Sequence, residues 1–193
     1  TMVLEKKGLI WLYFYNVDDR ELTNQNIFGF DKVLDISYSN DGRKLLFSGV
    51  KQGQNDIFLF TISSGSYEQV TNDIWDDLDP RFLENSGKII FSSNRPGDTL
   101  QWNEPTETGV IGKYFDLFIY DYGAKDPILR RVTNTPVASE KQPQPYMDGY
   151  FSFLSDENGI YNEYLGMLDS AVAFVDTTIH YRYFTSSFAV RNY

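Results

Sequence analysis

Residues 38–48, with the sequence YSNDGRKLLFS, join a polar segment to an apolar run through a glycine. Tight hairpin turns favour Asp41-Gly42, because glycine adopts a positive φ without steric cost. The apolar and aromatic residues around the turn favour a pleated strand. The same order returns at residues 82–92, FLENSGKIIFS, and at residues 147–155, MDGYFSFLS. The sequence therefore predicts three copies of one β-hairpin, with turns at Asp41-Gly42, Ser86-Gly87 and Asp148-Gly149.

A second repeated phrase alternates with the hairpins. Apolar runs at residues 12–15, 57–60 and 117–120 are each followed by a Thr-Asn pair, at Thr23, Thr71 and Thr133. The second interval between these pairs is longer than the first, and the surplus falls in residues 97–112. This stretch is rich in Gly, Pro, Thr, Asn and Glu and has no strand alternation, so it is predicted to be a loop inserted into a regular unit.

Each repeated unit holds four short predicted strands in roughly 45 residues, which is typical of a β-propeller blade. The chain shows no 3.6-residue periodicity, which a solenoid of helices requires. The continuous apolar runs suit strands that neighbouring blades cover on both faces. We expect an all-β fold, a β-propeller segment of four-stranded antiparallel blades that is incomplete in this chain. Phe47, Phe91 and Leu154 are expected to occupy one inward-packed position in successive blades.

Three segments resemble the TolB-type propeller repeat, a WD-like family found in large periplasmic or outer-membrane-associated proteins of Gram-negative bacteria. They are residues 40–48, residues 55–60 (NDIFLF) and residues 70–73 (VTND), and residues 91–95 (FSSNR) are similar to the family's strand end. The family has Trp where this chain has Tyr38, Phe82 and Pro145. The resemblance covers about residues 9–165.

The repeats divide the chain into four parts. Residues 1–30 are interpreted as the end of a preceding blade, residues 31–73 as a blade, and residues 74–135 as a blade with the inserted loop 97–112. Residues 136–193 are interpreted as an incomplete blade with a non-repeat excursion at residues 169–184. Because four such parts do not close a propeller of about 4–8 blades, we expect the 193 residues to be a segment of a larger protein.

The composition narrows the classes of partner and chemistry. The 17 Lys and Arg residues against 27 Asp and Glu residues give a net charge of −10, which disfavours nucleic acid as a partner. No apolar run reaches the roughly 18 residues of a membrane-spanning helix, so no transmembrane segment is expected. With no cysteine, the chain has neither a thiol nucleophile nor a thiolate metal ligand.

No set of catalytic residues is visible in the sequence. His180 is the only histidine, and no Gly-x-Ser-x-Gly motif accompanies it. The acidic residues Asp76, Asp77 and Asp79 offer oxygen atoms to calcium, but their spacing is not that of an EF-hand loop. The resemblance to the TolB-type repeat implies that Asp79-Pro80 is an inter-blade connection, where an Asp commonly forms turn hydrogen bonds. No catalytic residue, metal ligand or cofactor is predicted, and calcium binding near the three aspartates stays open.

A partner-binding site is predicted on the inserted loop. Trp102, Asn103 and Glu104 place an aromatic residue among polar ones, and tryptophan is enriched at interface hot spots. The alternative is a loop whose Trp102 lies back on the blade. Residues 142–145, QPQP, are interpreted as the Pro-containing connection of the repeat rather than as a polyproline ligand.

The resemblance implies a non-enzymatic protein-interaction scaffold, in the periplasm and possibly associated with the outer membrane, as part of a larger protein in an envelope or secretion assembly. Protein partners in the cell envelope are expected. One alternative is the gating propeller of a prolyl-oligopeptidase-like or tricorn-type peptidase, since similar repeats precede such catalytic domains. Another is a carbohydrate-binding propeller that uses exposed aromatic residues.

Overall fold

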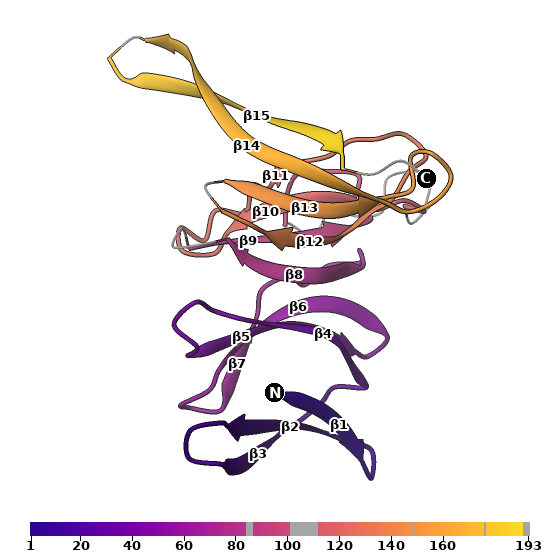
Figure 1. Ribbon diagram of the computed structural model, residues 1–193, viewed down its shortest axis with the longest axis vertical. Helices are drawn as coiled ribbons and strands as arrows, with labels where there is room; N and C mark the ends of the chain where they lie inside the picture. Colours follow the sequence, from indigo (N-terminus) through magenta and orange to yellow (C-terminus); the bar gives the residue numbers. More distant parts are fainter. Residues whose placement is uncertain (84–86, 101–111, 148, 176, 191–193) are drawn as a thin grey trace.

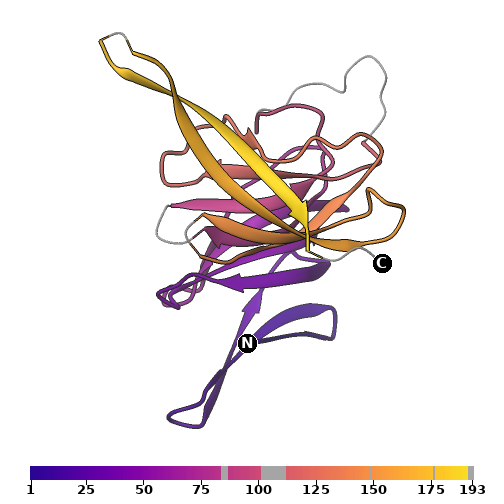
Figure 2. The ribbon, with the colours of Figure 1, turned by 45° about the horizontal axis from the view of Figure 1, so that its top comes forward.

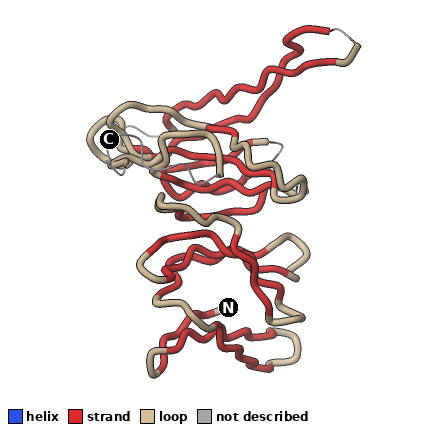
Figure 3. Tube along the Cα trace, turned by 180° about the vertical axis from the view of Figure 1, so that it is seen from behind, coloured by secondary structure: helices blue, strands red, loops and turns tan. Residues whose placement is uncertain are grey.

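The computed structural model describes residues 1–83, 87–100, 112–147, 149–175 and 177–190, and these residues form four antiparallel sheets stacked along one axis (Figure 1). The described residues contain strands and loops and no helix (Figure 3). The first sheet has three strands, β1 (Met2–Lys6), β2 (Leu9–Asn16) and β3 (Glu21–Ile27). No helix that could cross a membrane occurs in the described part of the chain.

The other three sheets each have four strands, and neighbours in the sheet are neighbours in the chain. The second sheet holds β4 (Lys32–Tyr38), β5 (Lys44–Lys51), β6 (Gln54–Thr61) and β7 (Ser66–Gln69). The third holds β8 (Asp77–Leu83), β9 (Lys88–Ser93), β10 (Asp116–Asp121) and β11 (Arg130–Arg131). The fourth holds β12 (Glu140–Pro145), β13 (Tyr150–Ser155), β14 (Asn162–Val175) and β15 (Ile179–Ala189).

The predicted glycine turns occupy equivalent places in the three four-stranded sheets. Gly42 joins β4 to β5, Gly87 joins β8 to β9, and Gly149 joins β12 to β13. Their φ angles of 67°, 64° and 82° lie in the left-handed region, where a side chain is disfavoured. Ser86 and Asp148, the predicted partners of two of these glycines, lie outside the described residues.

The core lies between the sheets, one apolar cluster to each junction. Leu12 of the first sheet packs with Phe58 and Phe60 of the second, and the ring of Phe14 stacks on that of Phe60 with centroids 6.5 Å apart. Further clusters join the second sheet to the third and the third to the fourth. Residues 56–60 are buried along their whole run, because both faces of β6 are covered. The aromatic excess of the sequence is thus used between sheets.

The predicted inward position is correct in two sheets and displaced by one residue in the last. Phe47 and Phe91 are 1% and 0% exposed, whereas Leu154 is only half-buried and Phe153 is 3% exposed. Ser155 pairs with the first residue of β12 as Ser93 pairs with the first residue of β8, so Phe153 corresponds to Phe91. Leu154 was therefore the wrong choice, because a slip of one residue moves a side chain to the other face of a strand.

The Thr-Asn phrase has the same role in two of its three copies. The backbone N–H of Ile57 donates to the hydroxyl of Thr71 at 2.9 Å, and the N–H of Leu117 donates to the hydroxyl of Thr133 at 2.8 Å. Thr23, by contrast, lies within β3 opposite Phe14, beside the β2–β3 turn. The first copy is therefore similar in sequence but not equivalent in structure.

The fourth sheet extends into a two-stranded arm. β13 pairs with β14 only as far as Met167, while the pairing of β14 with β15 continues to Val175 and Ile179. The arm projects beyond the stacked sheets (Figure 2). Residues 169–175 and 179–184, which belong to the expected excursion from the repeat, lie on these outer two strands of the sheet.

Candidate functional site

Three strands, β4, β8 and β12, are edge strands of their sheets, and each is in contact with the next along one edge of the stack, which we call the inner edge. Each strand carries an irregularity in its pairing, before Asp35, Arg81 and Gln144. Asp79 and Gln142 lie at the irregularities of β8 and β12 and have a φ of 53°, a left-handed value that is uncommon outside glycine. Bulges re-aim side chains, and here they direct polar groups between neighbouring sheets.

Polar contacts connect these inner strands across three sheets. The guanidinium of Arg81 forms an ion pair with Asp35 of β4 and donates to the side-chain oxygen of Gln144 at 3.2 Å. The backbone N–H of Gln142 donates to a carboxylate oxygen of Asp79 at 3.1 Å. Burial raises the pKa of Asp79, and the Gln142 N–H opposes this shift by stabilising the charged form. The inner edge is therefore a polar surface of fixed geometry.

A buried ion-pair cluster lies where the second sheet passes to the third. The side chain of Arg95 is 1% exposed and lies 3.0 Å from Asp73 and 2.7 Å from Asp77. Its Nε donates to the hydroxyl of Ser93 at 2.9 Å. Burial raises the pKa of Asp77 to about 6, although the positive charge of Arg95 acts in the opposite direction. This role of Arg95 was not predicted from the sequence, in which the position of Arg95 at the end of residues 91–95 was the one signal.

Two further carboxyl groups are buried and have raised pKa values. Burial raises the pKa of Asp56 to about 7, and the hydroxyl of Thr71 and the amide of Gln69 donate to it at 3.4 Å and 3.0 Å. Burial also raises the pKa of Glu140 to about 7, with the hydroxyl of Ser155 donating at 3.0 Å. A perturbed pKa alone does not make a catalytic site. These carboxylates are bonded to neighbouring strands, which is a structural role.

The structure does not bring the predicted acidic residues together. Asp76 accepts from the amide of Asn55 at 2.5 Å, while Asp77 and Asp79 bond to Arg95 and to the Gln142 backbone as described above. No group of three or more Asp, Glu or His side chains that could hold a metal ion occurs among the residues the structure describes.

The interpretation of the Pro-containing segments as connections was wrong. Asp79-Pro80 lies within β8, and residues 142–145 lie within β12. A proline lacks the N–H that a regular strand pairing needs, but it is tolerated at a bulge. Both segments coincide with the pairing irregularities. The prolines therefore mark bulges within strands and not connections between blades.

The predicted partner-binding residues Trp102, Asn103 and Glu104 lie outside the described residues. The residues at the base of this loop contact the β10–β11 connection and β11. Asp98 forms an ion pair with Arg131 at 3.0 Å, and its carbonyl accepts from the N–H of Leu129 at 2.8 Å. The loop therefore leaves the third sheet between β9 and β10, where the insertion was predicted. The backbone of His180, in β15, pairs with that of Phe174 in β14.

No family model matches the chain. A curated relative, the Tol-Pal system protein TolB of Wolinella succinogenes, is 33% identical over 97 residues, which are 50% of this chain and 22% of the relative. The uncharacterized peptidase YuxL of Bacillus subtilis is 29% identical over 104 residues, which are 54% of this chain and 14% of that protein. The chain thus spans less than a quarter of the length of either relative.

Among solved structures, TolB from Acinetobacter baumannii superposes with a TM-score of 0.62 at 16% identity, over 84% of this chain and 36% of that one. At this identity the likeness shows the fold. The sequence match to a TolB protein agrees with it. The four stacked sheets are therefore blades of an incomplete TolB-like β-propeller.

Proposed function

We propose that the chain is a non-enzymatic protein-interaction scaffold of the bacterial cell envelope, located in the periplasm and forming part of a larger protein in an envelope or secretion assembly. The observation that carries the proposal is the match to the Tol-Pal system protein TolB over half of the chain. The same proposal includes association with the outer membrane and a protein partner in the cell envelope.

The physical basis is a rigid platform formed by the stacked sheets. The strongly perturbed carboxyl groups of Asp56, Asp77 and Glu140 are buried and bonded to Thr71, Arg95 and Ser155, respectively. Rigid sheets supply geometry, while recognition comes from the loops they carry and from fixed polar surfaces. The inner edge around Arg81 and the loop at residues 97–112 are the two places where a protein partner would be held.

The loop is the contact that we propose for the partner, with Trp102 as its anchor. The loop should be replaced only between residues 101 and 111 by a glycine-serine linker of equal length, because Asp98 and Leu100 hold its base through Arg131 and the carbonyl of Pro127. A photo-crosslinking residue at position 102 is expected to capture a protein in intact cells. Excess unlabelled chain should compete for that protein, and unlabelled chain with the replaced loop should not. A crosslinker at Tyr146, which is 64% exposed, serves as the control. Equal capture from both positions would rule out the loop as the contact.

A gating propeller of a peptidase is the second candidate, and the match to YuxL favours it. Such an enzyme needs a separate catalytic domain with a Gly-x-Ser-x-Gly motif, which is not present in these 193 residues. Labelling of the full-length protein with a fluorophosphonate probe for active serines decides between the two. Labelling would support the peptidase, and its absence together with capture at position 102 would support the scaffold.

A further inference from the structure

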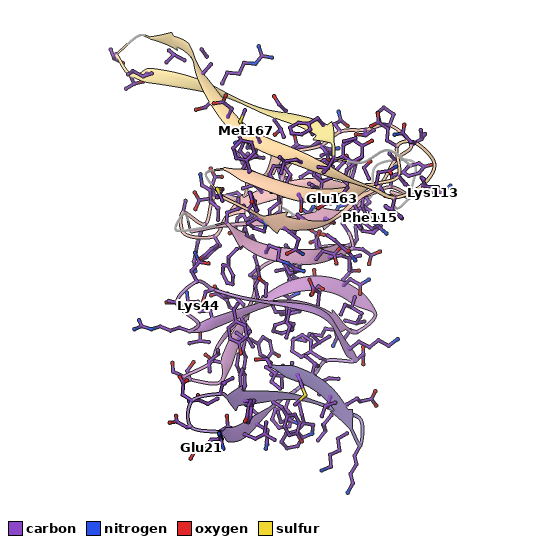
Figure 4. All side chains as sticks on the ribbon, viewed as in Figure 1. Glu21, Lys44, Lys113, Phe115, Glu163 and Met167 are labelled. Carbon is purple, nitrogen blue, oxygen red and sulfur yellow. The ribbon has the colours of Figure 1, made fainter. Side chains whose placement is uncertain are left out.

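A cavity of about 450 Å³ lies between the first and second sheets. It opens on the side of the stack where the β2–β3, β4–β5 and β6–β7 turns lie, and Glu21 marks this side of the first sheet in Figure 4. Its volume falls within the range of roughly 300–1,000 Å³ that small-molecule sites have. The contacts described so far leave this cavity without a role.

One wall is the outer part of the first sheet. The pairs Asn16↔Glu21, Phe14↔Thr23 and Leu12↔Gln25 place these side chains on one face of β2 and β3. That face turns toward the second sheet, because Leu12 belongs to the core between the two sheets. Stacking on Phe60 fixes the ring of Phe14 where the apolar core gives way to the polar cavity.

The opposite wall comes from the second sheet and contains Tyr38, Gly42 and Ile62. The turn that carries Gly42 is held by its own N–H, which donates to the Ser39 carbonyl at 2.8 Å. Tyr38 is 42% exposed, and its hydroxyl bonds to that of Thr1. The two walls thus offer aromatic surface on both sides.

The polar groups of the cavity are available for a ligand. The side chains of Glu21, Thr23 and Gln25 make no hydrogen bond or ion pair within the described part of the chain. A carboxylate accepts hydrogen bonds, whereas an amide and a hydroxyl both donate and accept. The amide of Asn16 is already used by Asp19 at 2.6 Å and by the N–H of Asp18 at 3.0 Å.

The charge of the cavity excludes one class of ligand. None of the described residues that line it is Lys, Arg or His, and Glu21 supplies a negative charge. A phosphate or carboxylate group would find no cation there and would be repelled by Glu21. An uncharged ligand with many hydroxyl groups and one apolar face suits the lining better, because aromatic rings cover the apolar face while Glu21, Thr23 and Gln25 bond to the hydroxyls.

We propose that this cavity binds an uncharged pyranose saccharide of one or two rings. The ring of Tyr38 lies against the C–H face of the sugar, and Glu21 and Gln25 bond to neighbouring hydroxyl groups. The inference goes beyond the proposed scaffold function and does not depend on it, since the cavity lies at the first junction and the proposed protein contact lies on the third sheet.

The test uses the full chain with two neutral disaccharides, cellobiose and N,N′-diacetylchitobiose, to distinguish a glucan from an amino-sugar chain. Saturation-transfer NMR detects binding, and amide chemical shifts of the unmodified protein locate it. We expect one of the two sugars to bind with shifts concentrated at Glu21, Gln25 and Gly42. Neutral tetraglycine and inorganic phosphate are the competing probes, and neither is expected to shift these amides.

Substitutions provide the second readout. Glu21→Ala and Tyr38→Ala are each expected to weaken sugar binding about tenfold, the loss of one charge-assisted hydrogen bond or one stacking surface. Glu68→Ala and Tyr146→Ala are matched controls on exposed residues outside the cavity and should bind as the unmodified chain does. Thermal unfolding of all four variants separates lost binding from lost folding.

The proposal is overturned if neither sugar shifts the cavity amides of the unmodified chain. It is also overturned if tetraglycine shifts the same amides and the sugars do not, or if folded Glu21→Ala and Tyr38→Ala bind the sugar unchanged. Failure of these experiments would leave the scaffold proposal intact, since that proposal is tested by capture at position 102.

Discussion

Arg95 is a single residue on which two buried carboxylates depend. Replacing it by Met leaves Asp73 and Asp77 buried without their cation, and we expect Arg95→Met to lower the free energy of unfolding by about 3–5 kcal/mol. Urea unfolding measures the loss. Arg43→Met, on a side chain that is 84% exposed, is the control and should change stability by less than about 0.5 kcal/mol. Similar losses in the two variants would contradict the assigned role of Arg95.

The raised carboxyl pKa values predict how stability changes with pH. Asp56 has a pKa of about 7 in the folded protein against a reference value of 3.8, so between these values the folded state binds more protons than the unfolded state. Glu140 behaves in the same way. These groups therefore stabilise the fold at low pH, and this contribution is lost as the pH rises toward about 7.

We expect the midpoint of thermal unfolding, measured by circular dichroism, to fall as the pH rises from 5 to 8. The fall should be less steep in Asp56→Asn. The pH range brackets the folded pKa values near 7. Asp18→Asn, on an exposed turn, should leave the slope unchanged. A midpoint that rises with pH through this range would show that Asp56 and Glu140 are not protonated in the folded state.

At the level of the strand, the register of β13 can be tested directly. Phe153 is 3% exposed and packs in the core between the third and fourth sheets, whereas Leu154 is half-buried on the other face. Phe153→Ala should cost about 3–5 kcal/mol of unfolding free energy, and Leu154→Ala clearly less. Chemical denaturation of the two variants gives the comparison. The reverse order would restore the register expected from the sequence.

How far the sequence predicted the strands depends on what each signal encodes. Gly42, Gly87 and Gly149 encode a local backbone requirement, so their turns were predicted correctly. The choice of Leu154 was wrong because it rested on aligning Ser155 with Ser48 and Ser92. Such an alignment does not determine which face of the strand a residue occupies. The proline segments marked bulges that only strand pairing reveals.

The site was predicted less well than the fold, for a physical reason. Arg95 lies far from Asp73 and Asp77 in the sequence, and the fold of the chain brings the three together. The cavity at Glu21 and Gln25 has its second wall on a different sheet. Neither arrangement follows a period in the sequence. The repeated phrases predict what recurs in each blade, while each of these sites occurs at a single junction among the residues that the structure describes.

For the whole molecule, the arm of the fourth sheet is expected to be dispensable for stability. Beyond Met167, β14 pairs only with β15, and Val172 and Ile179 are 54% and 55% exposed. Replacing residues 171–182 by Asn-Gly, which joins the paired residues Ser170 and Tyr183, should shift the thermal midpoint by less than about 4 °C.

Leu168→Ala is the control for this deletion, because Leu168 packs against the core of the fourth sheet. It should lower the midpoint, although it removes far fewer atoms. A large loss of stability on shortening the arm would mean that the arm supports the blades.

The same arm makes the protein easy to extend. A foreign domain spliced between two strands that pair only with one another adds length without pulling apart any blade, and such exposed hairpins are the places where natural chains accept insertions. A fluorescent protein or an affinity sequence placed between residues 171 and 182 would stand clear of both the first-junction cavity and the inner polar edge. The fold thus provides an attachment point from which the molecule can be watched or immobilised with its other surfaces uncovered.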